Sequence, residues 1–214
     1  MALRRNDFSK EDPWRIFRIM SEFVDGIEGL KDVKKAVSIF GSARSRPSNP
    51  YYKLAEKTAC TLAKSGYSII TGAGGGIMEA ANKGAKKGGG LSIGLNILIP
   101  IIQKPNKYIT RLIDFNYFFC RKVMFAKYSK AFCVFPGGFG TMDELFEALS
   151  LIQTQRVEPF PVILIGKDYW KGLLKWIKER PVKKGAILKS ELSIFTSLDK
   201  PTNVVKFIDD FYRE

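Results

Sequence analysis

Two kinds of segment alternate along most of the chain. Short apolar runs that end near glycine or proline are followed by longer segments in which apolar residues recur every three or four positions. The first pattern predicts buried strands, and the second predicts helices that pack on one side. The expected strands cover residues 36–40, 67–71, 91–97, 108–115, 131–135, 161–165 and 193–198. The expected helices cover residues 51–64, 77–87, 116–129, 142–155, 169–179 and 202–211.

The order of these segments predicts an α/β protein. The expected strands are continuous apolar runs, and a strand of that kind is buried on both faces, as in a parallel sheet covered by helices. We therefore expect residues 36–214 to form one doubly wound domain that binds ligands at the carboxyl ends of its strands. Apolar positions at helical spacing in residues 12–25 predict a further helix. Residues 1–35 are accordingly expected to be an N-terminal helical extension that packs on the domain.

Composition narrows the possible chemistry. The 214 residues include no histidine, which excludes Ser-His-Asp hydrolysis, Cys-His proteolysis and HExxH metal sites. The three cysteines, Cys60, Cys120 and Cys133, are far apart and form no CxxC pair, so neither a zinc site nor a thioredoxin-type site is expected. An odd number of cysteines in apolar surroundings is typical of reduced thiols and favours a cytoplasmic protein.

The charge of the chain is strongly positive. Lys and Arg total 35 against 21 Asp and Glu, which gives a formal charge of +14. This charge favours anionic partners, either phosphorylated small molecules or nucleic acid. The lysines form short, dispersed doublets such as Lys34-Lys35, Lys86-Lys87 and Lys183-Lys184, so we interpret them as a solubilising surface and do not expect nucleic acid as a partner. No stretch of bilayer-spanning length lacks charges, so no membrane partner is expected either.

Three loops that follow expected strands are rich in small residues: 41–44 (GSAR), 72–76 (GAGGG) and 136–141 (PGGFGT). Glycine allows the backbone to approach a ligand closely, and a helix that starts after such a loop presents unpaired N–H groups that suit phosphate. Thr141 is predicted to cap its helix or to donate its hydroxyl to a phosphate oxygen. One such loop is compatible with a simple tight turn, but three at one sheet edge favour a ligand site. Neither GxxxxGK[ST] nor GxGxxG occurs, which disfavours a P-loop ATPase and a dinucleotide dehydrogenase.

Charged residues beside these loops are the candidates for chemistry. Glu144 lies about one turn into the helix after the third loop, a position compatible with a reacting carboxylate or with a capping box. Arg121 and Lys122 lie in the apolar segment 118–125, where a cation needs a partner unless its stem carries it to the surface. Glu79 follows the second glycine loop, where an acid also suits the helix dipole.

Several of these segments resemble a known family. Residues 136–144 read PGGFGTMDE and are similar to the PGGxGTxxE signature of the LOG ("lonely guy") family. Residues 117–122 (YFFCRK) resemble the segment with the family's Arg-Lys pair, and residues 41–44 and 74–82 (GGGIMEAAN) resemble two further blocks. The resemblance covers roughly residues 36–166. Members of this family are cytokinin riboside 5′-monophosphate phosphoribohydrolases with a Rossmann-like fold, although many relatives carry the label "lysine decarboxylase".

The resemblance implies hydrolysis of the N-glycosidic bond of a nucleoside 5′-monophosphate, either AMP or a cytokinin riboside monophosphate, to a free base and ribose 5-phosphate. It assigns catalysis to two residues. Glu144 would stabilise the oxocarbenium-like transition state and orient or deprotonate water, and Arg121 would position the substrate or assist the leaving base. The implied substrate-binding residues are Gly41, Ser42, Gly74, Gly75, Gly76, Glu79, Lys122, Gly137, Gly138, Gly140 and Thr141.

The resemblance also sets expectations about partners. It implies no metal and no organic cofactor, and no lysine can be singled out for a pyridoxal Schiff base. It implies a homodimer with the site near the interface, to which the apolar helix around residues 118–125 could contribute. The alternative function is a non-catalytic nucleotide-binding protein or one that resembles the molybdenum-cofactor carriers.

Overall fold

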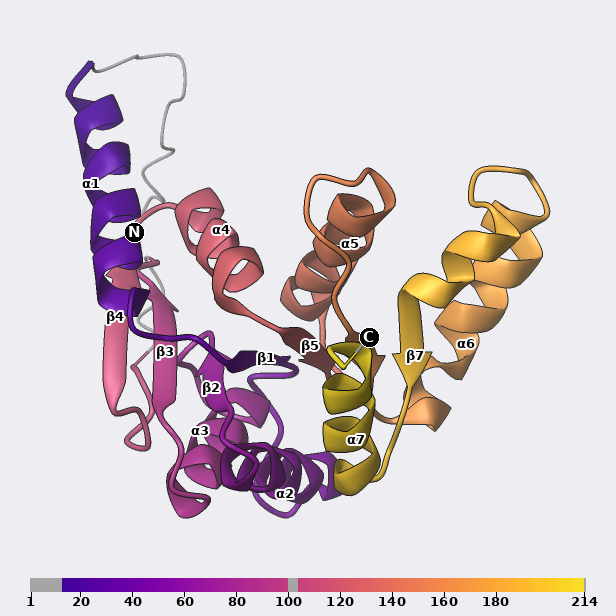
Figure 1. The fold of residues 1–214 in the computed structure, drawn as a ribbon, viewed down its shortest axis with the longest axis horizontal. Helices are drawn as coiled ribbons and strands as arrows, with labels where there is room; N and C mark the ends of the chain where they lie inside the picture. Colours follow the sequence, from indigo (N-terminus) through magenta and orange to yellow (C-terminus); the bar gives the residue numbers. More distant parts are fainter. Residues whose placement is uncertain (1–12, 100–103, 214) are drawn as a thin grey trace, which may run out of the picture.

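The computed structural model describes residues 13–99 and 104–213 and contains a seven-stranded, all-parallel sheet (Figure 1). The strands are β1 (Ala36–Phe40), β2 (Ser68–Thr71), β3 (Ser92–Ile97), β4 (Arg111–Phe115), β5 (Ala131–Val134), β6 (Val162–Leu164) and β7 (Phe195–Ser197). The helices are α1 (Pro13–Leu30), α2 (Pro50–Lys64), α3 (Ile77–Lys87), α4 (Phe118–Tyr128), α5 (Phe139–Gln153), α6 (Lys167–Ile177) and α7 (Pro201–Phe211). A π-helical turn, η1 (Lys178–Val182), and a 3-10 helix, η2 (Lys189–Ile194), complete the elements.

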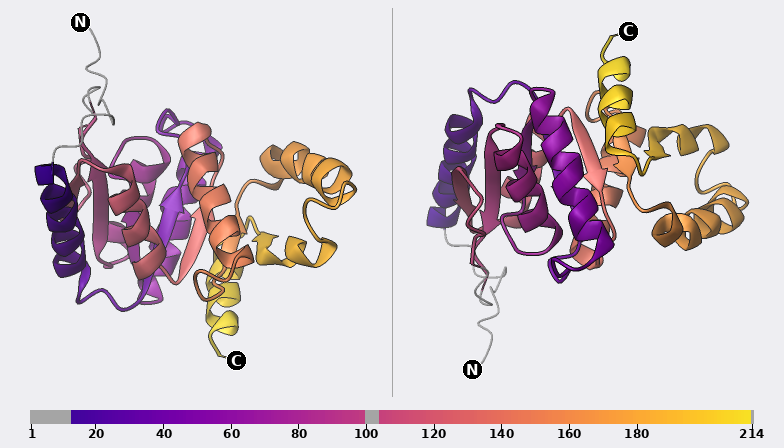
Figure 2. Two further views of the ribbon diagram at one scale, coloured as in Figure 1. Left: turned by 90° about the horizontal axis from the view of Figure 1, so that it is seen from above. Right: turned by 90° about the horizontal axis from the view of Figure 1, so that it is seen from below.

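Helices cover both faces of the sheet. Helices α2, α3 and α7 lie on one face, whereas α4, α5 and α6 lie on the other (Figures 1 and 2). Helix α1 packs on α4 and beside the edge strand β4. A separate apolar core fills the space between the sheet and each helical layer. In the part of the chain that the structure describes, no helix is both long enough and apolar enough to cross a membrane.

The order of strands in the sheet is β4-β3-β2-β1-β5-β6-β7. From β1 the chain steps outward to β4, and then returns to place β5 on the other side of β1. The topological switch point therefore lies between β1 and β5, and the loops after these two strands diverge there. The doubly wound α/β fold predicted from the sequence is confirmed.

The burial of the strands explains why apolar runs in the sequence predict them. All residues of β1, β3, β5 and β6 are buried, as expected for strands covered on both faces. The two edge strands differ, because β4 alternates between exposed and less exposed positions and β7 is half-buried throughout. The apolar runs thus predict the interior of the sheet better than its edges.

Several element boundaries differ from the sequence-based prediction. Helix α5 begins at Phe139 instead of 142, because Gly138 is extended and its carbonyl already accepts hydrogen bonds from the N–H groups of Thr141 and Met142, both at 3.0 Å. Thr141 therefore lies in the first turn of the helix and is not its cap. Strand β4 begins only at residue 111, and the first part of the strand expected at 193–198 is 3-10 helix.

The N-terminal helix helps to position α4. Glu22 of α1 is buried, and its carboxylate accepts hydrogen bonds from the backbone N–H groups of Asn116, at 2.8 Å, and Tyr117, at 3.1 Å, which precede α4. Leu30, at the end of α1, is fully buried in the main core. The division into an extension, residues 1–35, and a domain, residues 36–214, stays a prediction, and residues 1–12 lie outside the described part.

Candidate functional site

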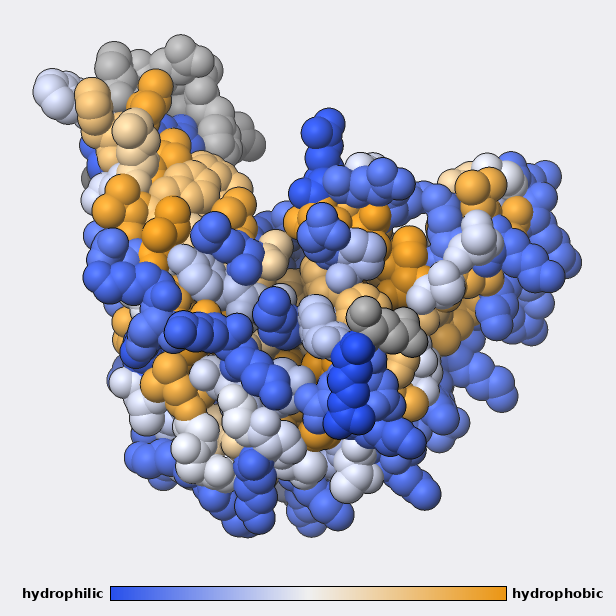
Figure 3. Space-filling model, in the orientation of Figure 1, coloured by the Kyte–Doolittle hydropathy of each residue, from blue (hydrophilic) through white to orange (hydrophobic). Residues whose placement is uncertain are grey.

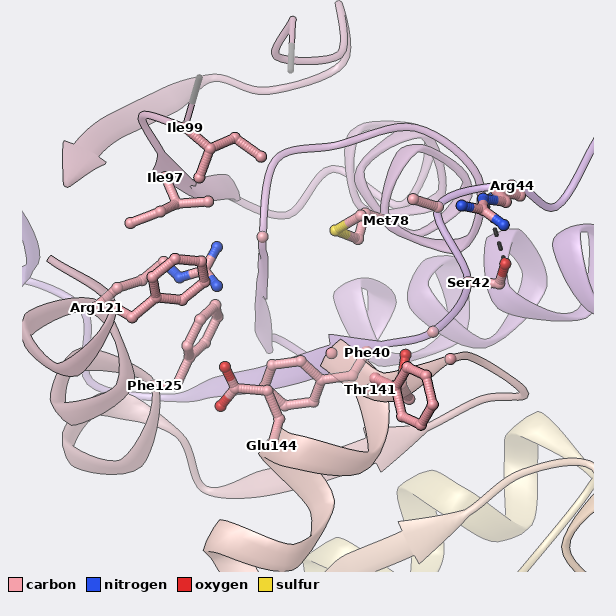
Figure 4. Close-up of a pocket in the computed structure, with 17 residues that line it drawn as sticks. Phe40, Ser42, Arg44, Met78, Ile97, Ile99, Arg121, Phe125, Thr141 and Glu144 are labelled. Atoms are coloured by element: carbon pink, nitrogen blue, oxygen red, sulfur yellow. Dashed lines mark hydrogen bonds between the residues drawn. The ribbon is translucent and has the colours of Figure 1, made fainter. Parts of the chain in front are cut away.

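A cavity of about 580 Å³ lies at the switch point, between the carboxyl ends of β1 and β5 (Figure 4). It brings together residues from both of the diverging loops and from α3, α4, α5 and the end of β3. The lining residues are Phe40, Gly41, Ser42, Ala43, Arg44, Gly72, Met78, Ile97, Ile99, Phe118, Arg121, Phe125, Gly138, Phe139, Gly140, Thr141 and Glu144.

Ser42 joins the three small-residue loops to one another. Its backbone N–H donates to the Pro136 carbonyl at 2.9 Å, and its carbonyl accepts from the Ile77 N–H at 3.0 Å. Its hydroxyl accepts from the backbone N–H of Arg44 at 3.1 Å. The predicted convergence of the loops at one sheet edge is therefore held by direct hydrogen bonds. Gly41 and Ser42 both line the cavity, as the sequence suggested.

The second glycine loop supports the cavity more than it lines it. Gly72 is part of the lining, whereas Gly74, Gly75 and Gly76 are not. Gly76 has a positive φ of 64°, and a Cβ at this position would collide with the carbonyl oxygen of Ser42, so only glycine allows the two loops to pack this closely.

An asparagine that the sequence analysis did not single out holds the same loop. The Asn106 side chain donates to the carbonyls of Ala73, at 3.1 Å, and Gly74, at 3.0 Å. It also donates to the buried Asn82 at 2.9 Å, which in turn accepts from the Thr71 hydroxyl at 2.7 Å. The glycine loop is thus held by a buried polar network.

The turn before α5 presents amide groups to the cavity. Gly138 and Gly140 line it, and a Cβ at either position would meet no heavy atom within 4 Å, so these glycines leave space that the protein does not fill. The first N–H groups of a helix have no intrahelical acceptor and carry partial positive charge. Thr141 is buried but also lines the cavity. The turn thus offers backbone N–H donors, open space and the Thr141 hydroxyl to an anionic ligand.

Gly137 differs from its neighbours in this turn. Its carbonyl accepts the Tyr169 hydroxyl at 2.6 Å, and a Cβ there would collide with the side chain of Thr141. It does not belong to the cavity lining. Gly137 therefore contributes to the conformation of the turn and not to the wall of the cavity.

Glu144 projects into the cavity from the second turn of α5 (Figure 4). The residue is only 6% exposed. Burial raises the pKa of its carboxyl group to about 7, and the positive charges of Lys122 and Arg121 oppose that rise. Because α5 begins at Phe139, Glu144 lies beyond the first turn, so the capping-box interpretation is wrong.

Arg121 enters the same part of the cavity from α4 (Figure 4). Burial lowers the pKa of its guanidinium, and the negative charges of Glu144 and Asp143 oppose this. Its centre lies 5.2 Å from the Phe118 ring and 5.8 Å from the Phe125 ring. Its Nε is buried and has no hydrogen-bond partner among the described residues. A buried donor without a partner at a cavity wall is a candidate ligand contact.

The next residue, Lys122, turns away from the cavity. Its ammonium group contacts the carboxylates of Asp143, at 2.8 Å, and Glu147, at 3.1 Å, and so links α4 to α5. Glu79 lies in the first turn of α3 and is not part of the lining, although the preceding residue, Met78, is. The structure thus brings Arg121 and Glu144 together and leaves Lys122 and Glu79 outside the lining.

The cavity also contains residues that the sequence analysis did not select. Arg44 lines it at the end opposite Arg121, beside Ser42 (Figure 4). Phe139, at the first position of α5, is 93% exposed and forms part of the rim. Arg44 was detectable in principle, because it closes the GSAR loop at the carboxyl end of a strand. Met78, Ile97 and Ile99 form an apolar wall that sequence spacing alone did not indicate.

The donor set limits the cofactors that would fit. Among the described residues, no group of three or more Cys, Asp or Glu side chains is arranged to hold a metal ion. The cavity lining contains no lysine, so a group held as a lysine Schiff base does not fit it.

The fold and cavity define a Rossmann-like α/β protein with a ligand site at its switch point. Residues 78–208, more than half of the chain, match the family model described as "Possible lysine decarboxylase". The chain belongs to this family, which includes the LOG proteins.

Named relatives are consistent with this assignment. A cytokinin riboside 5′-monophosphate phosphoribohydrolase of Arabidopsis thaliana is 27% identical over 198 residues, which is 88% of each chain. An enzyme of the same name from Rhodococcoides fascians is 28% identical over 70% of this chain and 77% of its own length. Among solved structures, a molybdenum cofactor binding protein from Rippkaea orientalis superposes with a TM-score of 0.62 at 22% identity, over 84% of this chain and 98% of the other. At that identity the similarity shows a shared fold alone.

Proposed function

We propose that this protein hydrolyses the N-glycosidic bond of a nucleoside 5′-monophosphate, AMP or a cytokinin riboside monophosphate. The observation that carries the proposal is the placement of Glu144 and Arg121 in one cavity with the amide-rich turn of α5. Relatives at 27% and 28% identity bear the name of this activity, which supports the reaction class. The products would be the free base and ribose 5-phosphate.

The cavity suggests how such a substrate would lie. The phosphate would bind at the start of α5, against the N–H groups near Gly138 and Gly140, with the Thr141 hydroxyl and the Arg44 guanidinium beside it. Glu144 lies about one helical turn further along α5, roughly 5 Å, a distance that suits a ribose attached to that phosphate. The base would then extend toward the apolar wall around Ile97.

The chemistry follows from charge. When the bond between C1′ and the base nitrogen breaks, its electron pair leaves with the base and the sugar becomes cationic. Ionised Glu144 would stabilise that cation and accept a proton from the water that forms the new C1′–O bond. Arg121 would donate a hydrogen bond to the departing base. The proton that Glu144 takes balances the proton that the base gains from solvent.

We also propose that two copies of the chain associate. Apolar residues of α1 and α4 form an exposed surface: Ile16, Phe17, Met20, Val24, Phe118, Phe119 and Val123 are each at least 45% exposed. Figure 3 shows apolar residues gathered over these helices at the upper left. Phe118 belongs both to this surface and to the cavity lining, so a dimer formed here would place the site near the interface. Sedimentation of the purified protein gives the oligomeric state, and a monomer at micromolar concentration would contradict this part of the proposal.

The three free cysteines support a cytoplasmic location. Cys120 and Cys133 are buried, and burial raises the pKa of Cys120 to about 11 and that of Cys133 to about 12. Such thiols are unreactive and persist in a reducing compartment. Fractionation of the source cells would test this.

The test of the activity is a product assay. The pure protein is incubated with AMP, N6-isopentenyl-AMP and adenosine, and the free base and ribose 5-phosphate are measured by chromatography. We expect base release from one or both monophosphates and at least ~10²-fold less from adenosine, which lacks the phosphate. Protein with Glu144→Gln, purified identically, controls for contaminating hydrolases.

The same assay distinguishes the alternative function. A nucleotide- or molybdenum-cofactor-carrying protein would retain its ligand stoichiometrically without releasing a base. Equilibrium dialysis of AMP beside the product assay separates the two cases. Tight retention with no product from either monophosphate would replace the enzyme proposal with the carrier.

A further inference from the structure

The segment around α6 carries a high density of positive charge. Residues 167–189 contain eight Lys or Arg and two Asp or Glu, so these 23 residues carry +6 of the total charge of +14. The segment comprises α6, η1 and the loop that follows, and it projects from the sheet beside β7 (Figure 2). The interpretation of the lysines as dispersed doublets therefore does not hold for this part of the molecule.

Four of these lysines share one helical face. Lys167, Lys171, Lys175 and Lys178 follow one another at intervals of four, four and three residues, which brings them onto one side of α6 and η1. All four line an open groove of about 520 Å³, which we call the α6 lysine groove. Its other lining residues are Asp168, Leu174, Glu179 and Ser197.

The lysine side chains of the groove are available to a ligand. All four residues are exposed. Of the four, only Lys175 has a carboxylate of the described residues within 4.0 Å, and that contact, to Glu179, is long at 3.9 Å. Exposed ion pairs of this kind contribute little to stability, so another anion can easily replace Glu179 beside Lys175.

An adjacent face of α6 is anchored in the protein. Trp170 is 1% exposed and Ile177 is 4% exposed, and the Trp170 indole donates to the Ile165 carbonyl at 3.1 Å. A helix fixed in this way holds its row of charges in place. Tyr169 and Trp176, which are 43% and 54% exposed, lie on the other side of α6 from the lysine row, so a bilayer that contacted the lysines would not bury these aromatic side chains.

We propose that the α6 lysine groove binds the phosphate backbone of double-stranded nucleic acid, independently of sequence. Lys167 and Lys178 are eleven positions apart along the helix, a rise of roughly 16 Å. A duplex carries one negative charge per ~1.7 Å of axis when both strands are counted, so a stretch of this length holds about ten phosphates, of which four would need to reach the four lysines. Arg180, Lys183 and Lys184 extend the positive surface beyond the helix. This binding is separate from the proposed hydrolysis, because no groove residue lines the catalytic cavity.

The experiment measures binding of a labelled 20-base-pair DNA duplex across salt concentrations, with a 20-base-pair RNA duplex, a single strand and anionic phospholipid vesicles as further probes. The test variant replaces the four groove lysines with glutamine (K167Q, K171Q, K175Q, K178Q). The matched control removes the same charge from four exposed lysines elsewhere (K53Q, K57Q, K64Q, K86Q). Circular dichroism and thermal melting confirm that each variant is folded.

For the wild type we expect affinity for the duplexes to fall by about 10²-fold between 50 and 200 mM salt, since four phosphate contacts give a logarithmic slope near −3.6. The groove variant should lose most of this affinity and slope, whereas the control variant should retain them. The proposal is overturned if the wild type does not bind a duplex at 50 mM salt, or if groove and control variants bind equally. Preference for the single strand or for vesicles over both duplexes would also overturn it. None of these outcomes depends on whether AMP is hydrolysed.

Discussion

Opposite charges of α4 and α5 face each other at two neighbouring places, and the surroundings of these two groups differ. Lys122 reaches Asp143 and Glu147 at 2.8 and 3.1 Å, and the Asp143 side chain is 56% exposed. Arg121 and Glu144 occupy the adjacent positions on the same two helices, but both project into the cavity. A rotation of about 100° per residue is enough to send consecutive side chains in different directions.

The pKa directions reflect this difference. Burial lowers the pKa of Lys122, but its hydrogen bonds to Asp143 and Glu147 outweigh that effect, and the net shift is upward. For Arg121 burial dominates, and the pKa falls despite the nearby carboxylates. The first group is a satisfied structural link. The second group, Arg121 and Glu144, consists of buried charged residues that line a cavity and have shifted pKa values. Such groups are typical of a site that binds a ligand.

The strongest test of this contrast is to remove each carboxylate in turn. Glu144→Gln should lower kcat for AMP by ~10²-fold or more, because a neutral amide neither stabilises a cationic sugar nor accepts a proton. Glu147→Gln, one turn further along α5, should lower kcat less than ~3-fold. Steady-state base release measures both. An equal loss of kcat in the two variants would contradict the assignment of Glu144 as the reacting carboxylate and Glu147 as a structural one.

Removing the cavity cation should have the next largest effect. We expect Arg121→Gln to reduce kcat/KM by ~10²-fold. In the wild type, kcat/KM should rise with pH and level off above a midpoint near 7, because Glu144 reacts in its ionised form and its pKa is about 7. The charge of Arg121 lowers that pKa, so the midpoint of the variant should move to higher pH. A midpoint that stays in place would show that the two groups do not interact.

The buried carboxylate should also reduce stability in a pH-dependent manner. Its pKa is near 7 in the folded protein against 4.5 as the ordinary value, so the unfolded chain ionises first as pH rises. Relative to Glu144→Gln, the wild type should lose stability between about pH 4.5 and 7, by on the order of 3 kcal/mol in total, with no further change above pH 7. Below pH 4 the two proteins should unfold alike. Urea denaturation at several pH values measures the difference, and a constant gap would contradict the assignment.

The turn of α5 allows a subtler test. Gly140→Ala should leave the fold intact, since a Cβ there meets no neighbour within 4 Å, yet the added methyl occupies space next to the proposed phosphate position. We expect KM for AMP to rise about 3- to 10-fold, with little change in the melting temperature. Gly172→Ala, at another helical position with open space, is the matched control and should not change KM. An unchanged KM in Gly140→Ala would indicate that the phosphate binds elsewhere.

The smallest effect is expected from the structural link. Lys122→Gln removes the shared partner of Asp143 and Glu147 and should cost about 1 kcal/mol of stability, because these carboxylates are partly solvated. Activity should fall less than ~3-fold at pH 9, where Glu144 is ionised in either protein. Lys127→Gln, an exposed position on the same helix, serves as control. A large loss of activity at high pH would place Lys122 in the binding site after all.

Much of this molecule could be predicted from local pattern. The buried strands β1, β3 and β5, the helices between them and the three glycine-rich loops at one sheet edge are all readable along the chain. Glu144 and Arg121 were selected for the same reason, since each is a charged residue at a fixed offset from a recognisable loop or apolar run. Their presence in one cavity agrees with that selection.

The sequence by itself determined the alternation of strand and helix, because periodicity is local and the burial of strands on both faces leaves continuous apolar runs. Only the tertiary structure decided that Lys122 points away from the cavity while Arg121 enters it, that Gly76 supports a loop instead of lining the cavity, and that four lysines of α6 and η1 form one groove. These outcomes depend on where a side chain points relative to neighbours distant in sequence. That direction is set by the packing of helices on the sheet, which no local pattern records.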